Sequence, residues 1–266
     1  MLKKFMLFLV LALVGLLAAG CSKSSPTSAN GSGTLQVNMI DSPAAFDAVN
    51  IEIDSVQAHI ATSDTTSGWV TLNSTPKTYD LLQLTNGVNA VIGSATVPAG
   101  RYSQVRLFIG SGSNVVIGGV SSPLTVPSGV QSGLKLNVDA TIQSDITYVL
   151  TLDFNADQSI VTTGGLSGQF MLKPVIRVIT TASNGAITGT VLPDSARPTI
   201  TAFNSSDTVS TAADTSGNFT VGYLPSGTYS LSIVPANTAL NDSTITNVSV
   251  TNGQTTNVGT VTLSNK

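Results

Sequence analysis

The stretch VNIEIDSVQAHI (Val49–Ile60) decides the fold class of this chain. Its apolar residues alternate with polar ones from Val49 to Ile53, and the alternation resumes at Val56 after a slip of one residue. A period of two is typical of a β-strand that buries one face. The same pattern recurs further along, at residues 35–39, 105–109, 134–138 and 148–154. The clusters of Gly, Pro, Asn, Asp and Ser between these runs are typical of turns, so an antiparallel β-sandwich is predicted.

A second series of short alternating runs follows residue 184, and it predicts a second, smaller β-sandwich. These runs lie at residues 187–191, 199–203, 218–221, 228–234, 244–251 and 258–263. The charge distribution also changes there, because residues 33–182 carry 6 basic and 10 acidic residues whereas residues 183–266 carry 2 basic and 4 acidic ones. Tyr79–Leu84 is the one stretch with a helical turn, a short connector. We therefore predict an all-β chain with domains at 34–182 and 184–266.

The N-terminus has the features of a secretory leader. Lys3 and Lys4 precede an apolar run at residues 5–17, which is too short to span a membrane and suits a signal peptide. The small residues directly before Cys21 resemble the lipobox of bacterial lipoproteins. This resemblance implies cleavage after residue 20 and attachment of acyl chains such as palmitate to Cys21. Residues 21–33 then form a flexible tether, and the Ser and Lys that follow Cys21 favour the outer membrane by similarity.

Composition excludes several classes of function. Only 9% of the residues are charged and the net charge is −3, which becomes −5 when residues 1–20 are removed. A basic footprint for nucleic acid is therefore absent from the sequence. The single Cys excludes disulfides, and the single His, His59, excludes a multi-His metal site. The alternation around His59 places it on the outward, exposed face of its strand.

Several segments of the first domain resemble the DUF4382 family, a domain of unknown function found in secreted and lipid-anchored proteins. They are Asp41-Ser42-Pro43, Tyr79-Asp80-Leu81-Leu82, Pro98-Ala99-Gly100-Arg101-Tyr102, Leu152-Asp153-Phe154 and Leu172-Lys173-Pro174-Val175-Ile176-Arg177. The resemblance implies a family without implying an activity.

The second domain resembles the carboxypeptidase regulatory-like domain, a prealbumin-type Greek-key sandwich. The resemblance rests on Gly185, Ile187 and Gly189, on Asp214, Gly217 and Phe219, and on Leu224-Pro225 with Gly227-Thr228-Tyr229. It implies a spacer or binding module, with Phe219 and Tyr229 in the core.

Two groups of residues are candidates for binding. Trp69 follows Ser67 and Gly68 in a predicted polar loop, and it either contacts a ligand such as a sugar or a partner, or covers the edge of the core. Asp153, Asn155 and Asp157 place oxygen ligands at alternate positions, so they form either a weak calcium site or an Asx-rich turn. No other cofactor is expected.

The sequence shows no coherent set of nucleophile, acid and base. A non-catalytic role in the cell envelope is therefore expected, in binding, adhesion or structure, with a glycan or another envelope protein as partner and the membrane reached through the lipid anchor. Two alternatives stay open, a carboxylate-based glycan hydrolase in the first domain and an accessory subunit of an outer-membrane complex. Two acids converging on a deep pocket would favour the hydrolase, whereas a flat sheet face would favour binding.

Overall fold

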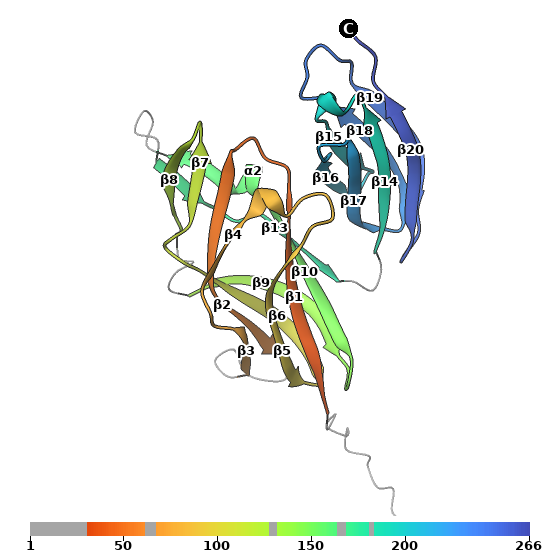
Figure 1. The fold of residues 1–266 in the computed structure, drawn as a ribbon. Coiled ribbons are helices and arrows are strands. Elements are labelled where there is room, and N and C mark those ends of the chain that lie inside the picture. The colour runs from red at the N-terminus through yellow and green to blue at the C-terminus, as the bar shows by residue number, and fades with distance from the viewer. Residues whose placement is uncertain (1–30, 62–67, 128–131, 164–168, 181–183) are drawn as a thin grey trace, which may run out of the picture. The chain divides into compact units, whose positions relative to one another are not determined.

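The computed structural model describes residues 31–61, 68–127, 132–163, 169–180 and 184–266. The predicted leader, the tether up to Asn30 and the predicted acylation site Cys21 lie outside these residues. The described chain is almost entirely β-structure, which confirms the predicted all-β class (Figure 1). Its strands form two units with separate hydrophobic clusters, here named the first β unit (residues 32–180) and the second β unit (residues 184–266).

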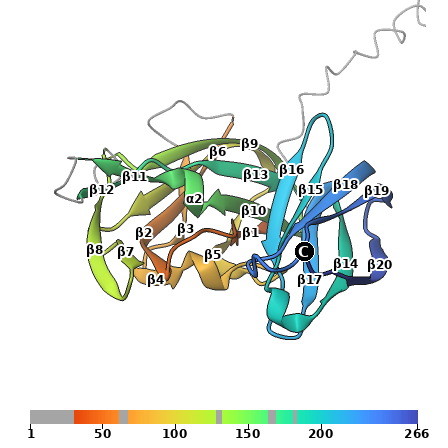
Figure 2. The same ribbon diagram turned by 90° about the horizontal axis from the view of Figure 1, so that it is seen from above.

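The first β unit contains a four-stranded and a nine-stranded sheet. The four-stranded sheet has the order β13-β10-β1-β5, with β1 (Ser32–Ser42), β5 (Ala90–Pro98), β10 (Thr147–Asn155) and β13 (Ile176–Thr180). The larger sheet has the order β11-β12-β8-β7-β2-β6-β9, and β3 and β4 also pair with β2. Its strands are β2 (Ala48–Ile60), β3 (Trp69–Asn73), β4 (Lys77–Asp80), β6 (Gly100–Ile109), β7 (Asn114–Ile117), β8 (Val120–Thr125), β9 (Leu134–Ile142), β11 (Ile160–Thr163) and β12 (Gln169–Leu172). Figure 2 shows β7 and β8 beside each other, with β12 and β11 beyond them.

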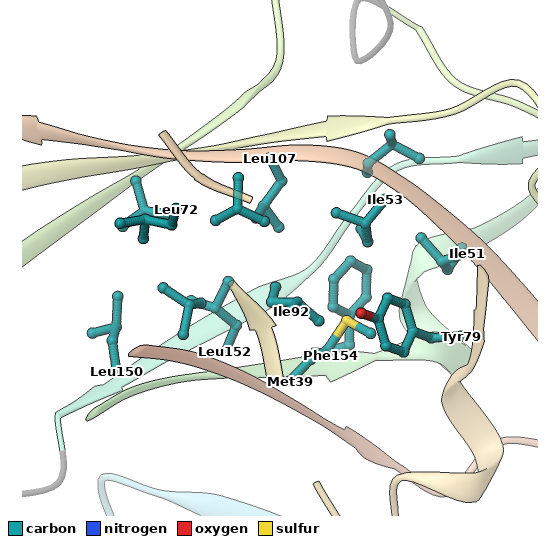
Figure 3. Packing of buried hydrophobic residues seen from close by; sticks show 14 of the residues in the cluster. Met39, Ile51, Ile53, Leu72, Tyr79, Ile92, Leu107, Leu150, Leu152 and Phe154 are labelled. Atoms are coloured by element: carbon teal, nitrogen blue, oxygen red, sulfur yellow. The ribbon is translucent and has the colours of Figure 1, made fainter. Parts of the chain in front are cut away.

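The two sheets bury their inner faces against each other. Side chains of β2 and β6, among them Ile53 and Leu107, face Met39, Leu152 and Phe154 of β1 and β10 (Figure 3). The register of β2 against β6 shifts between Ile53 and Ser55, which is the predicted slip in the alternation. This bulge lets the apolar residues on both sides of it reach the same core.

The expectation of purely antiparallel pairing is wrong in three ladders. β1 pairs with β10, β8 with β12, and β14 with β20 in parallel. Alternation along a strand reports which face is buried and carries no information on the direction of its neighbour, so the sequence pattern did not distinguish the two arrangements.

The second β unit has a three-stranded sheet, β17-β14-β20, and a four-stranded sheet, β16-β15-β18-β19. The strands are β14 (Asn184–Leu192), β15 (Thr199–Phe203), β16 (Thr208–Ala212), β17 (Asn218–Pro225), β18 (Gly227–Val234), β19 (Ser243–Val250) and β20 (Thr255–Thr262). Phe219 and Tyr229 are 2% and 1% exposed, so their predicted place in the core is confirmed.

Helical structure is limited to short turns in the described residues. They are the 3-10 turns η1 (Leu81–Gln83) and η4 (Asp194–Ala196) and the four-residue helix α2 (Ala156–Ser159). The predicted connector near Tyr79 is thus confirmed as η1. Among the described helices, none has the length and apolar character needed to cross a membrane.

Candidate functional site

The outward face of β3, β2, β6 and β9 carries a group of aromatic, amide and cationic side chains. Val56, Ala58, Val105 and Leu107 point into the core, so their neighbours along β2 and β6 point outward. Across the sheet, one row of outward residues joins Trp69, His59, Gln104 and Asn137, and the next joins Gln57, Arg106 and Lys135. We name this surface the β3–β9 face, defined by these seven residues.

Trp69 is the first residue of β3, so its assignment to a polar loop is wrong. It pairs in register with His59, and the two ring centroids lie 4.9 Å apart with a tilt of 57°. The Trp ring covers the imidazole, which leaves His59 only 7% exposed. The expectation that His59 is exposed is therefore also wrong, although its strand face was predicted correctly.

Arg106 stacks its guanidinium on the Trp69 ring, with the central carbon 3.8 Å from the ring centroid. The same carbon lies 5.8 Å from the centroid of Phe108. A guanidinium above an indole is stabilised by the electron-rich ring face. Arg106 Nε is buried and has no hydrogen-bond partner. The contact with Trp69 therefore holds the guanidinium in a position where its Nε–H donor has no acceptor.

Lys135 lies directly opposite Arg106 in the β6–β9 ladder. Like charges at such a cross-strand position repel each other and destabilise the sheet. Within the described part of the chain, the two ion pairs join Arg101 to Asp139 and Arg177 to Asp153, so neither Arg106 nor Lys135 has an acidic partner there. This pair of cations forms a local positive site on a chain whose net charge is negative.

A shallow hollow of about 200 Å³ lies over these residues, lined by His59, Trp69, Ser103, Gln104, Arg106 and Lys135. Gln104 Nε2 donates a hydrogen bond to Asn137 Oδ1 over 3.3 Å. Each amide has further donor and acceptor capacity beyond this bond. The hollow thus combines an aromatic ring, two cations, and the Gln104 amide and Ser103 hydroxyl, which can bind hydroxyl groups of a ligand.

Asp41 and Asp153 are two buried acids on neighbouring strands of the four-stranded sheet. Asp41 is 5% exposed, its Oδ1 accepts a hydrogen bond from the Ala156 amide, and its Oδ2 has no partner. Burial, together with the nearby charges of Asp153 and Asp80, raises the pKa of Asp41 to about 8. Asp153 accepts hydrogen bonds from Arg177 Nε and Nη2 at 3.1 and 2.8 Å.

The cavity that Asp41 and Asp153 line measures about 20 Å³. This volume holds about one water molecule and excludes a sugar ring. The geometry of these two acids therefore does not favour the glycan hydrolase.

The three residues of the predicted calcium site take part in separate local contacts. Asp153 pairs with Arg177, Asn155 caps α2 by accepting a hydrogen bond from the Gln158 amide, and Asp157 lies in the first turn of α2. No cluster of three or more His, Cys, Asp or Glu side chains suitable for a metal occurs in the described ranges. Calcium binding stays a prediction.

Residues 32–174 match the family described as "Domain of unknown function (DUF4382)". The chain belongs to the DUF4382 family. The matched range contains every residue of the β3–β9 face, so this surface is a feature of the DUF4382 domain in this chain. No curated protein matches the sequence.

Several solved structures share a limited likeness with the chain. A cohesin–X-dockerin complex from Acetivibrio cellulolyticus is 24% identical over 30% of this chain, with a TM-score of 0.25, and the match spans 56% of that chain. The minor pilin GBS52 of Streptococcus agalactiae is 10% identical, with 87% of this chain and 96% of the pilin covered and a TM-score of 0.24. The shaft pilin SpaA of Lactobacillus rhamnosus GG is 9% identical, with 89% and 98% covered and a TM-score of 0.24. Because these TM-scores are low, we infer neither fold nor function from the likenesses.

Trp69 was identified from the sequence, but its place beside Arg106, Lys135 and Gln104 was not. The outward positions of β6 and β9 follow from the alternation that predicts those strands. What the alternation does not contain is the pairing of β6 with β9, which brings Arg106 and Lys135 together.

Proposed function

We propose that this chain is a non-catalytic, lipid-anchored protein of the cell envelope that binds glycans on the β3–β9 face of its DUF4382 domain. The observation that carries the proposal is the hollow over Trp69, where an aromatic ring lies beside amide, hydroxyl and cationic side chains. Such a surface offers charge and hydrogen bonds to the polar groups of a sugar, and the part of Trp69 that lines the hollow adds apolar contact. The small volume next to Asp41 and Asp153 supports binding over hydrolysis.

The anchor in this proposal is Cys21, which lies outside the described residues. Several acyl chains hold a protein on a membrane stably, whereas one chain does not. The negative charge of the chain argues against a second, electrostatic attachment to anionic lipid.

The proposal is tested by applying the detergent-solubilised full chain to an array of neutral and acidic glycans. We expect saturable binding to at least one class of glycan, with no new reducing ends released during prolonged incubation. Binding to none of these glycans would contradict the proposed function. Release of reducing ends would instead favour the alternative that the first domain is a glycan hydrolase.

Trp69→Ala is expected to weaken glycan binding at least tenfold, because it removes the aromatic surface of the hollow and the support of Arg106. Phe203→Ala is the matched control, since Phe203 is an exposed aromatic residue of the second β unit. Titration of both variants against the best glycan of the array measures the effect. Equal affinities for the two variants would place the glycan site elsewhere.

Cys21→Ser is expected to abolish labelling by a fatty-acid analogue and to move the protein from the membrane fraction to the soluble fraction. The thiol is the acceptor of the acyl chains, and the chain has no other Cys. Metabolic labelling followed by fractionation measures both effects. Persistent labelling of the variant would exclude acylation at this residue.

A further inference from the structure

The β3–β9 face carries two positive charges, although the net charge of the chain is negative. Arg106 and Lys135 face each other across β6 and β9, and neither forms an ion pair within the described ranges. On the same strands, Arg101 and Asp139 pair at 2.8 Å, so this sheet does match opposite charges elsewhere. An anion bound between Arg106 and Lys135 would remove their mutual repulsion.

Arg106 is held in place from two sides. The Trp69 ring lies on one side of its guanidinium, and Gly133 lies against its aliphatic stem. Gly133 has a φ of +69°, and a Cβ at this position would lie 2.5 Å from Arg106 Cγ and 2.8 Å from Cδ. The close approach requires glycine, so Gly133 positions Arg106. A cation that is already fixed before binding loses little entropy when a ligand arrives.

The rest of the hollow limits the kind of anion. Gln104 and Ser103 line the hollow and suit hydroxyl groups, and the part of the Trp69 side chain that lines it offers apolar contact to a sugar ring. The negative net charge of the chain disfavours long polyanions such as nucleic acid, whose charges extend far beyond this small site, whereas a short acidic oligosaccharide places only a few charges outside it. A single carboxylate on a sugar ring fits both the local cations and the overall charge.

We infer that the β3–β9 face is specific for acidic sugars, with Arg106 and Lys135 binding the sugar carboxylate and Gly133 holding Arg106 in position. This inference rests on the proposed glycan-binding function. It names the class of ligand, a glycan whose residues carry carboxylates, such as uronic acids.

Calorimetric titration of the full chain in detergent tests the inference with two matched probes. The β-1,4-linked hexamer of glucuronic acid and that of glucose differ only in the carboxylate at C6. We expect the acidic hexamer to bind at least tenfold more tightly, and the preference to shrink as salt is raised. Equal affinity for both hexamers would overturn the inference and leave the glycan-binding function intact. Binding of neither hexamer, nor of any other glycan tested, would overturn both.

Substitutions of single residues test which side chains cause the preference for the acidic hexamer. Arg106→Gln and Lys135→Gln should each reduce the preference for the acidic hexamer at least fivefold, whereas Arg101→Gln, which removes a cation already paired with Asp139, should leave it unchanged. An undiminished preference for the acidic hexamer in both Arg106→Gln and Lys135→Gln would overturn the inference.

Poly-L-glutamate, which carries carboxylates without a sugar ring, should bind more weakly than the acidic hexamer. Tighter binding of the polypeptide would point to an acidic protein partner and contradict the sugar class.

Gly133→Ala tests the positioning role, and Gly253→Ala is its matched control. Gly253 has a φ of +70° and no atom within 4 Å of the added Cβ, so both variants strain the backbone but only one displaces Arg106. We expect Gly133→Ala to reduce the preference for the acidic hexamer at least threefold with little change in affinity for the neutral one. An unchanged preference in this variant, with the fold intact by circular dichroism, would exclude the positioning role.

Discussion

Replacing Asp41 with Asn is expected to stabilise the fold by several kcal/mol at pH 9 and by less than about 1 kcal/mol at pH 4. The Asp41 carboxyl is buried, one of its oxygens has no partner, and Asp153 and Asp80 add negative charge nearby. Its pKa is therefore about 8 in the folded chain, against the ordinary value of 3.8. An amide at this position keeps the acceptor for the Ala156 amide and cannot ionise.

The sign of the pH dependence follows from this raised pKa. Well below pH 3.8 the carboxyl is protonated in both the folded and the unfolded chain, so its ionisation does not affect the free energy of unfolding. Between pH 3.8 and 8 the unfolded chain loses the proton and the folded chain keeps it, so the free energy of unfolding falls as pH rises. Above pH 8 this contribution to the free energy of unfolding is constant, and the full shift in pKa corresponds to at most about 6 kcal/mol.

Urea unfolding of the wild type and Asp41→Asn at pH 4, 7 and 9 measures this difference. Asp139→Asn is the control, because the exposed Asp139 has its pKa lowered by Arg101. Its removal should cost a little stability near neutral pH, the opposite direction to Asp41→Asn. A stability gain for Asp41→Asn that does not grow between pH 4 and pH 9 would contradict the account of the buried carboxyl.

Phe154→Ala is expected to lower the free energy of unfolding by about 3 to 5 kcal/mol. Phe154 is 0% exposed and lies between the two sheets of the first β unit (Figure 3). Truncation removes the apolar surface of the ring and leaves a cavity that the surrounding strands fill only in part. The expected loss of stability is therefore larger than the transfer free energy of the removed ring atoms alone.

Urea unfolding at neutral pH tests this expectation, with Phe203→Ala as the control. Phe203 is 38% exposed in the second β unit, so its truncation should cost under about 1 kcal/mol. A similar loss in the two variants would show that the face-to-face packing of the two sheets does not dominate the stability of the first β unit.

The long, alternating strands were predictable because burial of one face sets their sequence. β2 was predicted together with its bulge, and Thr199–Phe203 was predicted with the bounds that β15 has. Strands without a regular repeat were missed, such as β4, which buries only Tyr79, and the longer β5, whose buried residues do not alternate. Parallel pairing of β1 with β10 was also missed, because the two strands lie more than 100 residues apart and each satisfies its alternation in either direction.

The candidate site was predictable only in part. Trp69 was found as a rare residue type, while its role depends on Arg106, which reaches it across the sheet from β6. The burial of His59 likewise depends on a partner strand and not on its own sequence neighbours. Cross-strand neighbours follow from register, and a single sequence does not fix register between strands joined by long connections.

The fluorescence of Trp69 reports directly on a ligand at the β3–β9 face, because the sequence contains a single Trp and this residue lines the proposed site. Titration with the glucuronic acid hexamer should give a saturable change in its emission, and the change should require at least tenfold higher concentrations in Arg106→Gln. The glucose hexamer should act only at much higher concentrations. Unchanged emission at concentrations of the acidic hexamer that saturate calorimetric binding would place the ligand elsewhere and contradict the account.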